Sequence, residues 1–343
     1  MKQARNLIIH STSIFFFFLS LNSFAAVDYP ANPSIDGVAI YLSDSGVSKI
    51  NIETLETEWN VLTYRQTFEP VVTKNFVLVG SSTGIYVIDK STGSIIRNIQ
   101  TSSLLFSPVV ENNIAYVGSK SDLFQAIDLR TGKTLWSKKY DGWVYPPALV
   151  GETLVIGGNR PYLTGLDKTT GITLWKKWIS QELVYRPIKI GDKQVVISTF
   201  GNETQLINSK NGDVVWTFKS KAPNLAPVLV KNKIIFGTLD GRLQSVNVSN
   251  GKLVWEYDMG GHLSIQVYPD IATVMISNNQ GRIVKVDAND GHVKWQKNIN
   301  NDFIGTPILI KEDVFVFISK RFNTFSSIEV FDSSNQHGDY DES

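Results

Sequence analysis

The stretch LFQAIDLRTGKTLW, residues 123–136, contains the pattern that decides the fold. An Asp is followed by a Gly four positions later and by a Trp after four more. The spacing recurs with Asp or Asn first, as Asp128-Gly132-Trp136, Asp167-Gly171-Trp175, Asn208-Gly212-Trp216, Asn247-Gly251-Trp255 and Asp287-Gly291-Trp295. Two degenerate copies are Asp89-Gly93 with Arg97 in the Trp position, and Asn51 and Trp59 with Leu55 in the Gly position. Self-similarity at a fixed period of about forty residues indicates a repeat architecture.

A proline that opens an apolar run is the second repeated feature. It occurs at Pro33, Pro70, Pro108, Pro147, Pro187, Pro227, Pro269 and Pro307. Each unit then holds four strand-like runs rich in β-branched and aromatic residues, and in the third unit these are 108–110, 114–118, 123–128 and 134–140. Four short strands in about forty residues are typical of a propeller blade. We therefore predict an all-β, eight-bladed β-propeller of four-stranded antiparallel blades.

The last unit is incomplete. It supplies strand-like runs 307–310, 314–318 and 328–332, but no outer strand. Residues 27–31 are expected to provide that strand and to close the ring, because closure removes open sheet edges. Seven blades with an irregular extension are the alternative.

Each repeated position has a mechanical role in this fold. The Asp or Asn side chain bonds the backbone of the turn between the third and fourth strands. The Gly supplies a positive φ there. The large flat Trp is suited to packing between adjacent blades, and this structural role is expected for Trp136, Trp175, Trp216, Trp255 and Trp295.

Composition excludes several classes of function. The chain has 343 residues, and its net charge is +1, with 33 basic and 32 acidic residues, so nucleic acid is not an expected partner. It has no cysteine, hence no disulfide and no thiolate nucleophile. His262, His292 and His337 lack metal-ligand spacing. We expect no catalytic, cofactor-binding or metal-binding residues and no cofactor.

The N-terminus is typical of a secretory signal. Lys2 and Arg5 precede the apolar run 14–21, and residues 23–25 (Ser-Phe-Ala) form a small-x-small cleavage site. We predict a signal peptide at 1–25, a propeller at 26–335 and a disordered acidic tail at 336–343. The mature protein is expected in the periplasm as a monomer without a direct membrane anchor.

The motif Ala126-Ile127-Asp128-x-x-Thr131-Gly132-x-x-x-Trp136 resembles the repeat of the PQQ-type, or quinoprotein-like, β-propellers. The resemblance covers essentially the whole mature chain. It implies one of two functions: a dehydrogenase that uses pyrroloquinoline quinone and calcium, or a non-enzymatic scaffold of the BamB type, which serves outer-membrane protein assembly. The chain lacks the insertions and the cysteine pair of many quinone enzymes, so the resemblance favours a scaffold with a protein partner in the cell envelope. BamB-type proteins are anchored through a cysteine after the signal, and this chain has none.

Residues that depart from the repeat gather in two kinds of loop, those leading into the inner strands and those joining second and third strands. These loops are expected to share one face. Aromatic residues and Arg favour interface hot spots. The predicted partner-binding set is Trp143, Tyr145, Arg160, Tyr162, Tyr185 and Arg186, and the same loops also hold Arg65, Phe68, Phe106, Trp178, Phe200, His262, Arg321 and Phe322. The alternatives are that such residues fill the central funnel, or that the funnel binds a small ligand or polymer.

Cell fractionation checks the export prediction. The mature protein, beginning near Ala26, is expected in the soluble periplasm or the medium, because residues 1–25 have the pattern of a cleaved leader. Recovery of the uncleaved chain in the inner membrane would contradict it.

Reconstitution with pyrroloquinoline quinone and calcium distinguishes a non-enzymatic scaffold from a quinone-dependent dehydrogenase. We expect neither stoichiometric quinone binding nor dye-linked oxidation of alcohols or sugars. Binding with turnover would establish the enzyme instead.

Overall fold

The computed structural model describes residues 34–43, 46–62, 67–101, 104–183, 185–261, 263–268, 272–298, 307–311, 314–321 and 324–332. These residues form β-strands and turns, with no α-helix among them. They fall within two compact units, Ala26–Leu229 with Val248–Lys252, and Val230–Asn247 with Leu253–Ser343. The predicted signal peptide and the acidic tail lie outside the described residues, so these boundaries stay predictions.

The strands pair in chain order into antiparallel sheets, each a hairpin-connected meander. The first five blades are β1–β4 (Ser34–Ile35, Ala39–Ser43, Val47–Asn51, Thr57–Val61), β5–β8 (Val71–Val72, Phe76–Ser81, Gly84–Asp89, Ile95–Gln100), β9–β12 (Val109–Glu111, Ile114–Gly118, Leu123–Asp128, Thr134–Lys139), β13–β16 (Ala148–Val150, Thr153–Ile156, Tyr162–Asp167, Thr173–Trp178) and β17–β20 (Ile188–Ile190, Gln194–Ser198, Glu203–Asn208, Val214–Lys219). Two more are β21–β24 (Val228–Val230, Lys233–Gly237, Arg242–Asn247, Leu253–Asp258) and β25–β28 (Leu263–Tyr268, Thr273–Asn278, Arg282–Asp287, Val293–Asn298). The propeller of four-stranded antiparallel blades is therefore confirmed.

The number of blades is not the predicted one. The described residues form seven four-stranded blades, and the strands of the last unit, β29 (Pro307–Lys311), β30 (Val314–Arg321) and β31 (Thr324–Asp332), form a three-stranded sheet. The prediction of eight such blades is wrong, because it counted proline-led inner strands. The unit that begins at Pro307 lacks the Asp-to-Gly-to-Trp sequence that builds a fourth strand. Residues 27–31, expected to supply that strand, lie outside the described residues.

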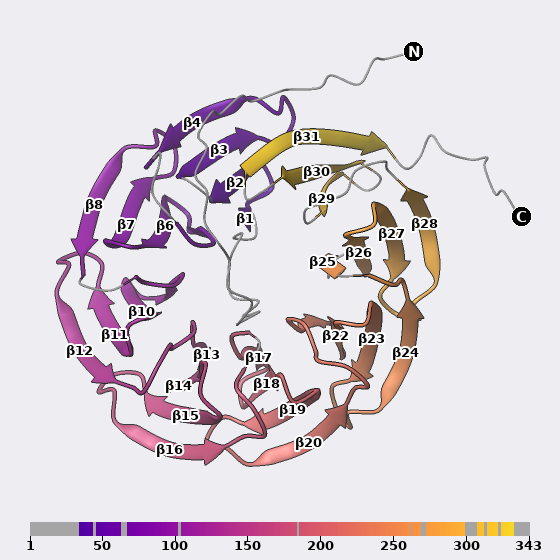
Figure 1. Ribbon diagram of the computed structural model, residues 1–343. Coiled ribbons are helices and arrows are strands. Elements are labelled where there is room, and N and C mark those ends of the chain that lie inside the picture. The colour runs from indigo at the N-terminus through magenta and orange to yellow at the C-terminus, as the bar shows by residue number, and fades with distance from the viewer. Residues whose placement is uncertain are drawn as a thin grey trace, which may run out of the picture. The chain divides into compact units, whose positions relative to one another are not determined.

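Burial follows the position of each strand in its blade. The second and third strands are buried along most of their length, as in β10 and β11, whereas the fourth strand alternates exposed and less exposed residues, as in β12. In the unit that contains the first five blades, Figure 1 shows β4, β8, β12, β16 and β20 at the periphery. The core of each blade therefore lies on its two middle strands.

A tight turn and a β-bulge connect the third strand to the fourth. In the third blade, Asp128 Oδ1 accepts the backbone N–H groups of Arg130 and Thr131 at 2.7 and 3.2 Å, and Gly132 has a φ of +75°. These hydrogen bonds hold the pKa of the Asp128 carboxyl below its usual value. The register then shifts so that Ala126 pairs with Trp136 and Ile127 with Thr134, which leaves Leu135 as the extra residue. The bulge turns Leu135 to the solvent.

The tryptophans connect consecutive blades. Trp175 of β16 donates its indole N–H to the carbonyl of Ser209, 2.8 Å away, in the turn of the next blade. A Cβ on Gly212 in that turn would lie 2.5 Å from the ring atom Cε3 of Trp175, so only glycine lets the ring approach. The same pair of contacts joins Trp59 to Lys90 and Gly93, Trp136 to Lys168 and Gly171, Trp216 to Val248 and Gly251, and Trp255 to Ala288 and Gly291.

The remaining two positions of this series differ. Arg97 stands where the second blade would have its Trp, and a Cβ on the facing Gly132 would meet nothing closer than 3.7 Å. Trp295 lies half-exposed on β28, and the turn that follows β31 is outside the described residues. The glycine is thus tightly packed where the preceding unit ends in Trp.

The contribution of the Trp175–Gly212 contact to the free energy of unfolding can be measured with the variant Gly212→Ala. The matched control is Gly132→Ala. Both glycines have a φ of +75°, so each substitution carries the same left-handed penalty, about 1–2 kcal/mol. Gly212→Ala also forces a methyl into the Trp175 ring, which costs about a further 1–3 kcal/mol. Urea unfolding should show the larger loss for Gly212→Ala. Equal losses would contradict the docking role of Trp175.

Candidate partner-binding surface

In the second to fifth blades, the segment that leads into the inner strand is joined to the chain at the end of the second strand. Single antiparallel bridges make these links at Thr67–Ser81, Leu105–Ser119, Val144–Gly158 and Leu183–Thr199. In the fourth blade the carbonyl of Trp143 comes so close that a Cβ on Gly158 would lie 1.8 Å from its oxygen. The backbone therefore fixes Trp143 beside the loop that joins β14 to β15.

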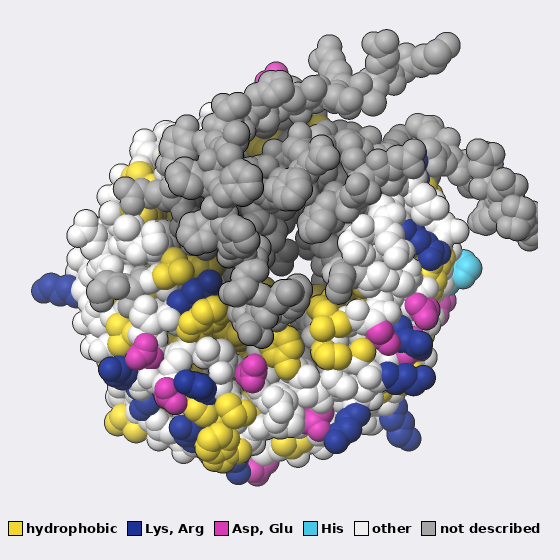
Figure 2. All heavy atoms as spheres, viewed as in Figure 1, with side chains coloured by type: hydrophobic (Ala, Val, Ile, Leu, Met, Phe, Trp, Pro, Cys, Tyr) yellow, Lys and Arg dark blue, Asp and Glu magenta, His cyan; other side chains and the backbone are white. Residues whose placement is uncertain are grey.

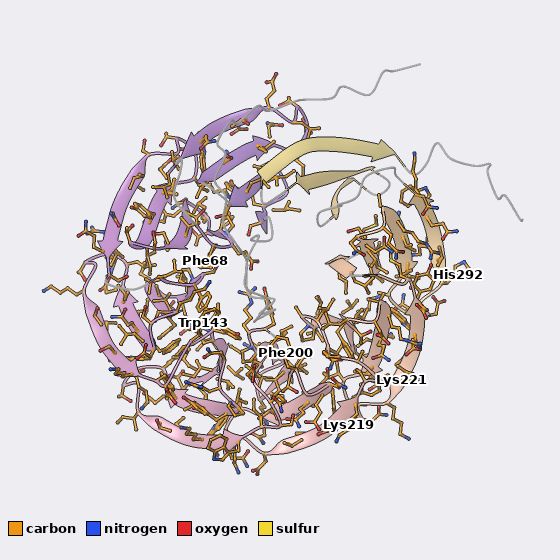
Figure 3. All side chains as sticks on the ribbon, in the orientation of Figure 1. Phe68, Trp143, Phe200, Lys219, Lys221 and His292 are labelled. Carbon is orange, nitrogen blue, oxygen red and sulfur yellow. The ribbon has the colours of Figure 1, made fainter. Side chains whose placement is uncertain are left out.

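A small recess lies between the end of the third blade and the start of the fourth. Its lining includes Trp143, Arg160 and Tyr162, three of the six predicted partner-binding residues, together with Tyr140 and Thr164. The space inside is about 10 Å³, enough for one water-sized group. The backbone N–H of Trp143 donates to Asn159 Oδ1 at 2.7 Å, which ties one wall of the recess to the other. Figure 3 shows Trp143 beside the start of β13.

Arg160 is held at the rim of this recess. Its Nε donates to the backbone carbonyl of Asp141 at 2.9 Å, and its Nη2 donates to the Asp141 carboxylate at 3.3 Å. The Asp141 side chain is 83% exposed, so the ionic part of this pair is weakened by water. The backbone contact fixes the position of the guanidinium, and the carboxylate contributes little to it.

Tyr162 and Trp178 extend the recess into an exposed aromatic surface. The two residues are direct partners in the pairing of β15 with β16, and their rings meet edge to face at 6.0 Å and 83°. Lys176 places its ammonium 3.7 Å from the centre of the Tyr162 ring, within cation–π distance. Trp178 is 77% exposed, the largest exposure among the large hydrophobic residues that the structure describes. We call Trp143, Arg160, Tyr162, Lys176 and Trp178 the aromatic surface.

Trp178 belonged to the wider group of loop residues but not to the predicted set of six. The sequence does contain a feature that identifies Trp178 as a candidate. Position 178 follows the repeated Trp175 by three residues, and the corresponding positions in the neighbouring repeats are Lys139 and Lys219. A large apolar residue at that exposed position departs from the repeat, and this departure marks it. Figure 2 shows other hydrophobic side chains gathered beside Lys and Arg on the face in view.

Tyr145 does not lie on this surface. It is 1% exposed, and its ring packs edge to face on Phe106 at 5.7 Å. Phe106 in turn packs on Phe68 at 5.3 Å, so three residues, each two positions before the proline of its unit, form a column across consecutive blades. The Lys120 ammonium lies 5.6 Å from the Phe68 ring and 4.8 Å from the Trp143 ring. Tyr145 therefore packs in the interior and offers no ring to a partner.

Tyr185 and Arg186 contact the second blade. The Tyr185 hydroxyl donates to Glu69 Oε2 at 3.4 Å, and Arg186 Nη2 lies 3.8 Å from Glu69 Oε1. Glu69 precedes β5, whereas Tyr185 and Arg186 precede β17, within the same compact unit. The predicted set is thus divided. Trp143, Arg160 and Tyr162 come together, whereas Tyr185 and Arg186 are paired with Glu69, which lies 116 residues before Tyr185 in the chain.

The recess contains two buried hydroxyl groups without hydrogen-bond partners. Tyr140 Oη and Thr164 Oγ1 are buried and make no hydrogen bond within the described structure. Burial, with a smaller contribution from Tyr162, raises the pKa of the Tyr140 hydroxyl well above its usual value, so the group stays protonated. The recess therefore presents two neutral hydroxyls behind a cationic rim.

The described residues contain no group of three or more His, Cys, Asp or Glu side chains placed to hold a metal ion. The absence of a cofactor stays a prediction. The described residues form no helix that is long and apolar enough to cross a membrane.

One family model and two solved structures are similar to this chain. The family model described as outer membrane protein assembly factor BamB matches residues 23–177 and 119–337. No curated protein matches the chain. Two similar solved structures are the computationally designed Ika8 protein (14% identity, TM-score 0.75, 88% of this chain and 95% of that one) and BamB from Moraxella catarrhalis (13% identity, TM-score 0.67, 93% and 100%). At these identities the structures show a shared fold. Because the family model matches nearly the whole length, the chain belongs to the BamB family of PQQ-type β-propellers.

Proposed function

We propose that this protein is a non-catalytic scaffold of the cell envelope that binds a protein partner through the aromatic surface. The observation that carries the proposal is the exposure of Trp178 beside Tyr162, Lys176 and Arg160. The exposed Trp178 ring lies against the half-buried Tyr162 ring, and an apolar area of this kind favours a surface that another protein covers. The periplasm is the compartment that fits the N-terminal pattern.

The geometry of the surface suits protein recognition. Tyr162 and Trp178 stand on paired strands, and Trp143 is fixed by its bond to Asn159, so the aromatic groups lose little freedom when a partner binds. Aromatic residues and Arg are enriched in binding hot spots because each combines a large apolar area with a polar group. Lys176 and Arg160 add positive charge beside the rings. These features favour a partner with an apolar patch and acidic residues.

The family supports a more specific role. The matching model is described as an assembly factor for outer membrane proteins, and a solved BamB shares the fold. We therefore propose that the partner belongs to the outer-membrane assembly apparatus. In this proposal, the protein associates with the membrane through that partner.

Site-specific photo-crosslinking in cells tests the aromatic surface. A photoreactive amino acid at position 178 should give a discrete adduct with an envelope protein, because this position is exposed among the proposed contacts. The matched control is position 95 on β8, where Ile95 is also an exposed hydrophobic residue of an outer strand. An adduct at 95 with none at 178 would place the interface elsewhere.

Charge and ring substitutions test the same surface without a probe. Trp178→Ala with Arg160→Glu should abolish capture of the crosslinked partner and leave the melting temperature within a few degrees, because both side chains are exposed. Arg186→Glu is the control, since Arg186 is directed to Glu69 and lies outside the aromatic surface. Undiminished capture by the double variant would refute the proposed function.

A further inference from the structure

We propose that the recess between the third and fourth blades binds the carboxylate of an Asp or Glu side chain of the partner. Tyr140 and Thr164 would donate hydrogen bonds inside the recess, and Arg160 would pair with the acid at the rim. This inference rests on the proposed function, because it names the chemical group that the surface recognises.

The first support is the pair of unsatisfied hydroxyls. Thr164 is 2% exposed, and its Oγ1, like Tyr140 Oη, is buried without a hydrogen-bond partner. A buried polar group without a partner is destabilising, and native proteins seldom retain two side by side in one recess. Each hydroxyl can donate one hydrogen bond to an acceptor that enters. A group with two acceptor sites would satisfy both.

The second support is the charge at the rim. The Arg160 guanidinium has five N–H donors, and the contacts to Asp141 engage Nε and Nη2. The Asp141 carboxylate is mostly in solvent, so an incoming acid can displace it from Nη2 while the Nε bond to the backbone carbonyl holds the guanidinium in place. The ammonium of Lys176, over the Tyr162 ring, adds a second positive charge. An anion is therefore favoured over a neutral acceptor or a cation.

The size and the lining residues of the recess restrict which anionic group can enter it. A space of about 10 Å³ admits one oxygen-sized group and leaves the rest of the ligand at the mouth. One carboxylate oxygen fits inside, and the second then lies near Arg160. Trp143 and Tyr162 line the mouth, where they would contact the methylene groups of the acidic side chain and an adjacent apolar residue. An acidic residue beside an aromatic one matches this arrangement.

Blocked dipeptides provide a defined probe. N-acetyl-Phe-Glu-amide should shift the indole N–H resonance of Trp143 in two-dimensional NMR spectra of the full chain, with a fitted affinity at least tenfold higher than that of N-acetyl-Phe-Gln-amide. The two probes differ only in that the Gln probe has a neutral carboxamide in place of the carboxylate. Equal affinity for both, or no shift with either, would overturn the carboxylate inference.

Two conservative variants separate binding from folding. Thr164→Val and Tyr140→Phe remove the hydroxyls and nearly keep the shapes, so each should weaken Phe-Glu binding at least tenfold. Because both hydroxyls lack partners in the free protein, neither variant should lower the melting temperature. A purely structural role predicts the reverse, a lower melting temperature with unchanged peptide binding.

Arg186→Gln is the matched control for Arg160→Gln. The first should leave dipeptide binding unchanged, since Arg186 is directed to Glu69, and the second should reduce the preference for Glu over Gln. Retained preference in Arg160→Gln would overturn the inference. Failure of these dipeptide experiments leaves the crosslink at position 178 as a separate readout, so an error about the carboxylate is distinguishable from an error about the scaffold.

Discussion

The docking of a tryptophan from one blade onto the turn of the next is the contact on which the rest of the structure depends. In each pair the indole N–H bonds a backbone carbonyl, and the ring lies against a glycine that no larger residue can replace without moving it. The donor and the glycine come from different repeats, so a single repeat cannot form the contact. Stability is thus a property of neighbouring blades, as in other repeat proteins. The Arg97–Gly132 pair shows that a looser contact is tolerated at one junction.

This constraint also determines where variable residues can be placed. The middle strands are buried and the turn with its bulge is fixed by the Trp contact, which leaves the loops at the start of each blade and the outer strands for function. The bridge between Val144 and Gly158 brings two such loops together in the fourth blade. A rigid blade then presents Trp143, Tyr162 and Trp178 in a fixed arrangement. Such preorganisation reduces the entropy lost when a partner binds.

The recess adds specificity to a surface that is otherwise apolar. Tyr140 and Thr164 carry an unfavourable free energy in the unbound protein because their hydroxyls are buried without partners. A ligand with acceptors at the right positions relieves that cost, so a partner without them gains less. Arg160, held by a backbone carbonyl, supplies the charge that distinguishes an acid from an amide. Apolar area and polar selectivity therefore come from adjacent residues.

The sequence by itself determined the local architecture, because each of its signals acts within a few residues. The Asp-to-Gly turn, the alternation of the strands and the period of about forty residues all follow from short-range geometry, and the four predicted strands of the third unit agree with β9–β12 to within a residue. The sequence also indicated that the last unit has no outer strand of its own, but the eighth four-stranded blade expected from it is not found among the described residues. A proline marks an inner strand, whereas the fourth strand depends on a motif that the last unit lacks.

Only the tertiary structure decided which of the predicted site residues share a surface. Tyr145 and Trp143 are two positions apart in one loop, yet Tyr145 is packed on Phe106 of the preceding blade and Trp143 lines the recess. Tyr185 and Arg186 occupy the same kind of loop in the sequence. Their side chains, however, contact Glu69 at the start of the second blade, more than a hundred residues earlier in the chain. The unsatisfied hydroxyls of Tyr140 and Thr164 carry no sequence signal. The physical reason is that burial and pairing at these positions are set by neighbouring blades, whose contacts are non-local in the chain.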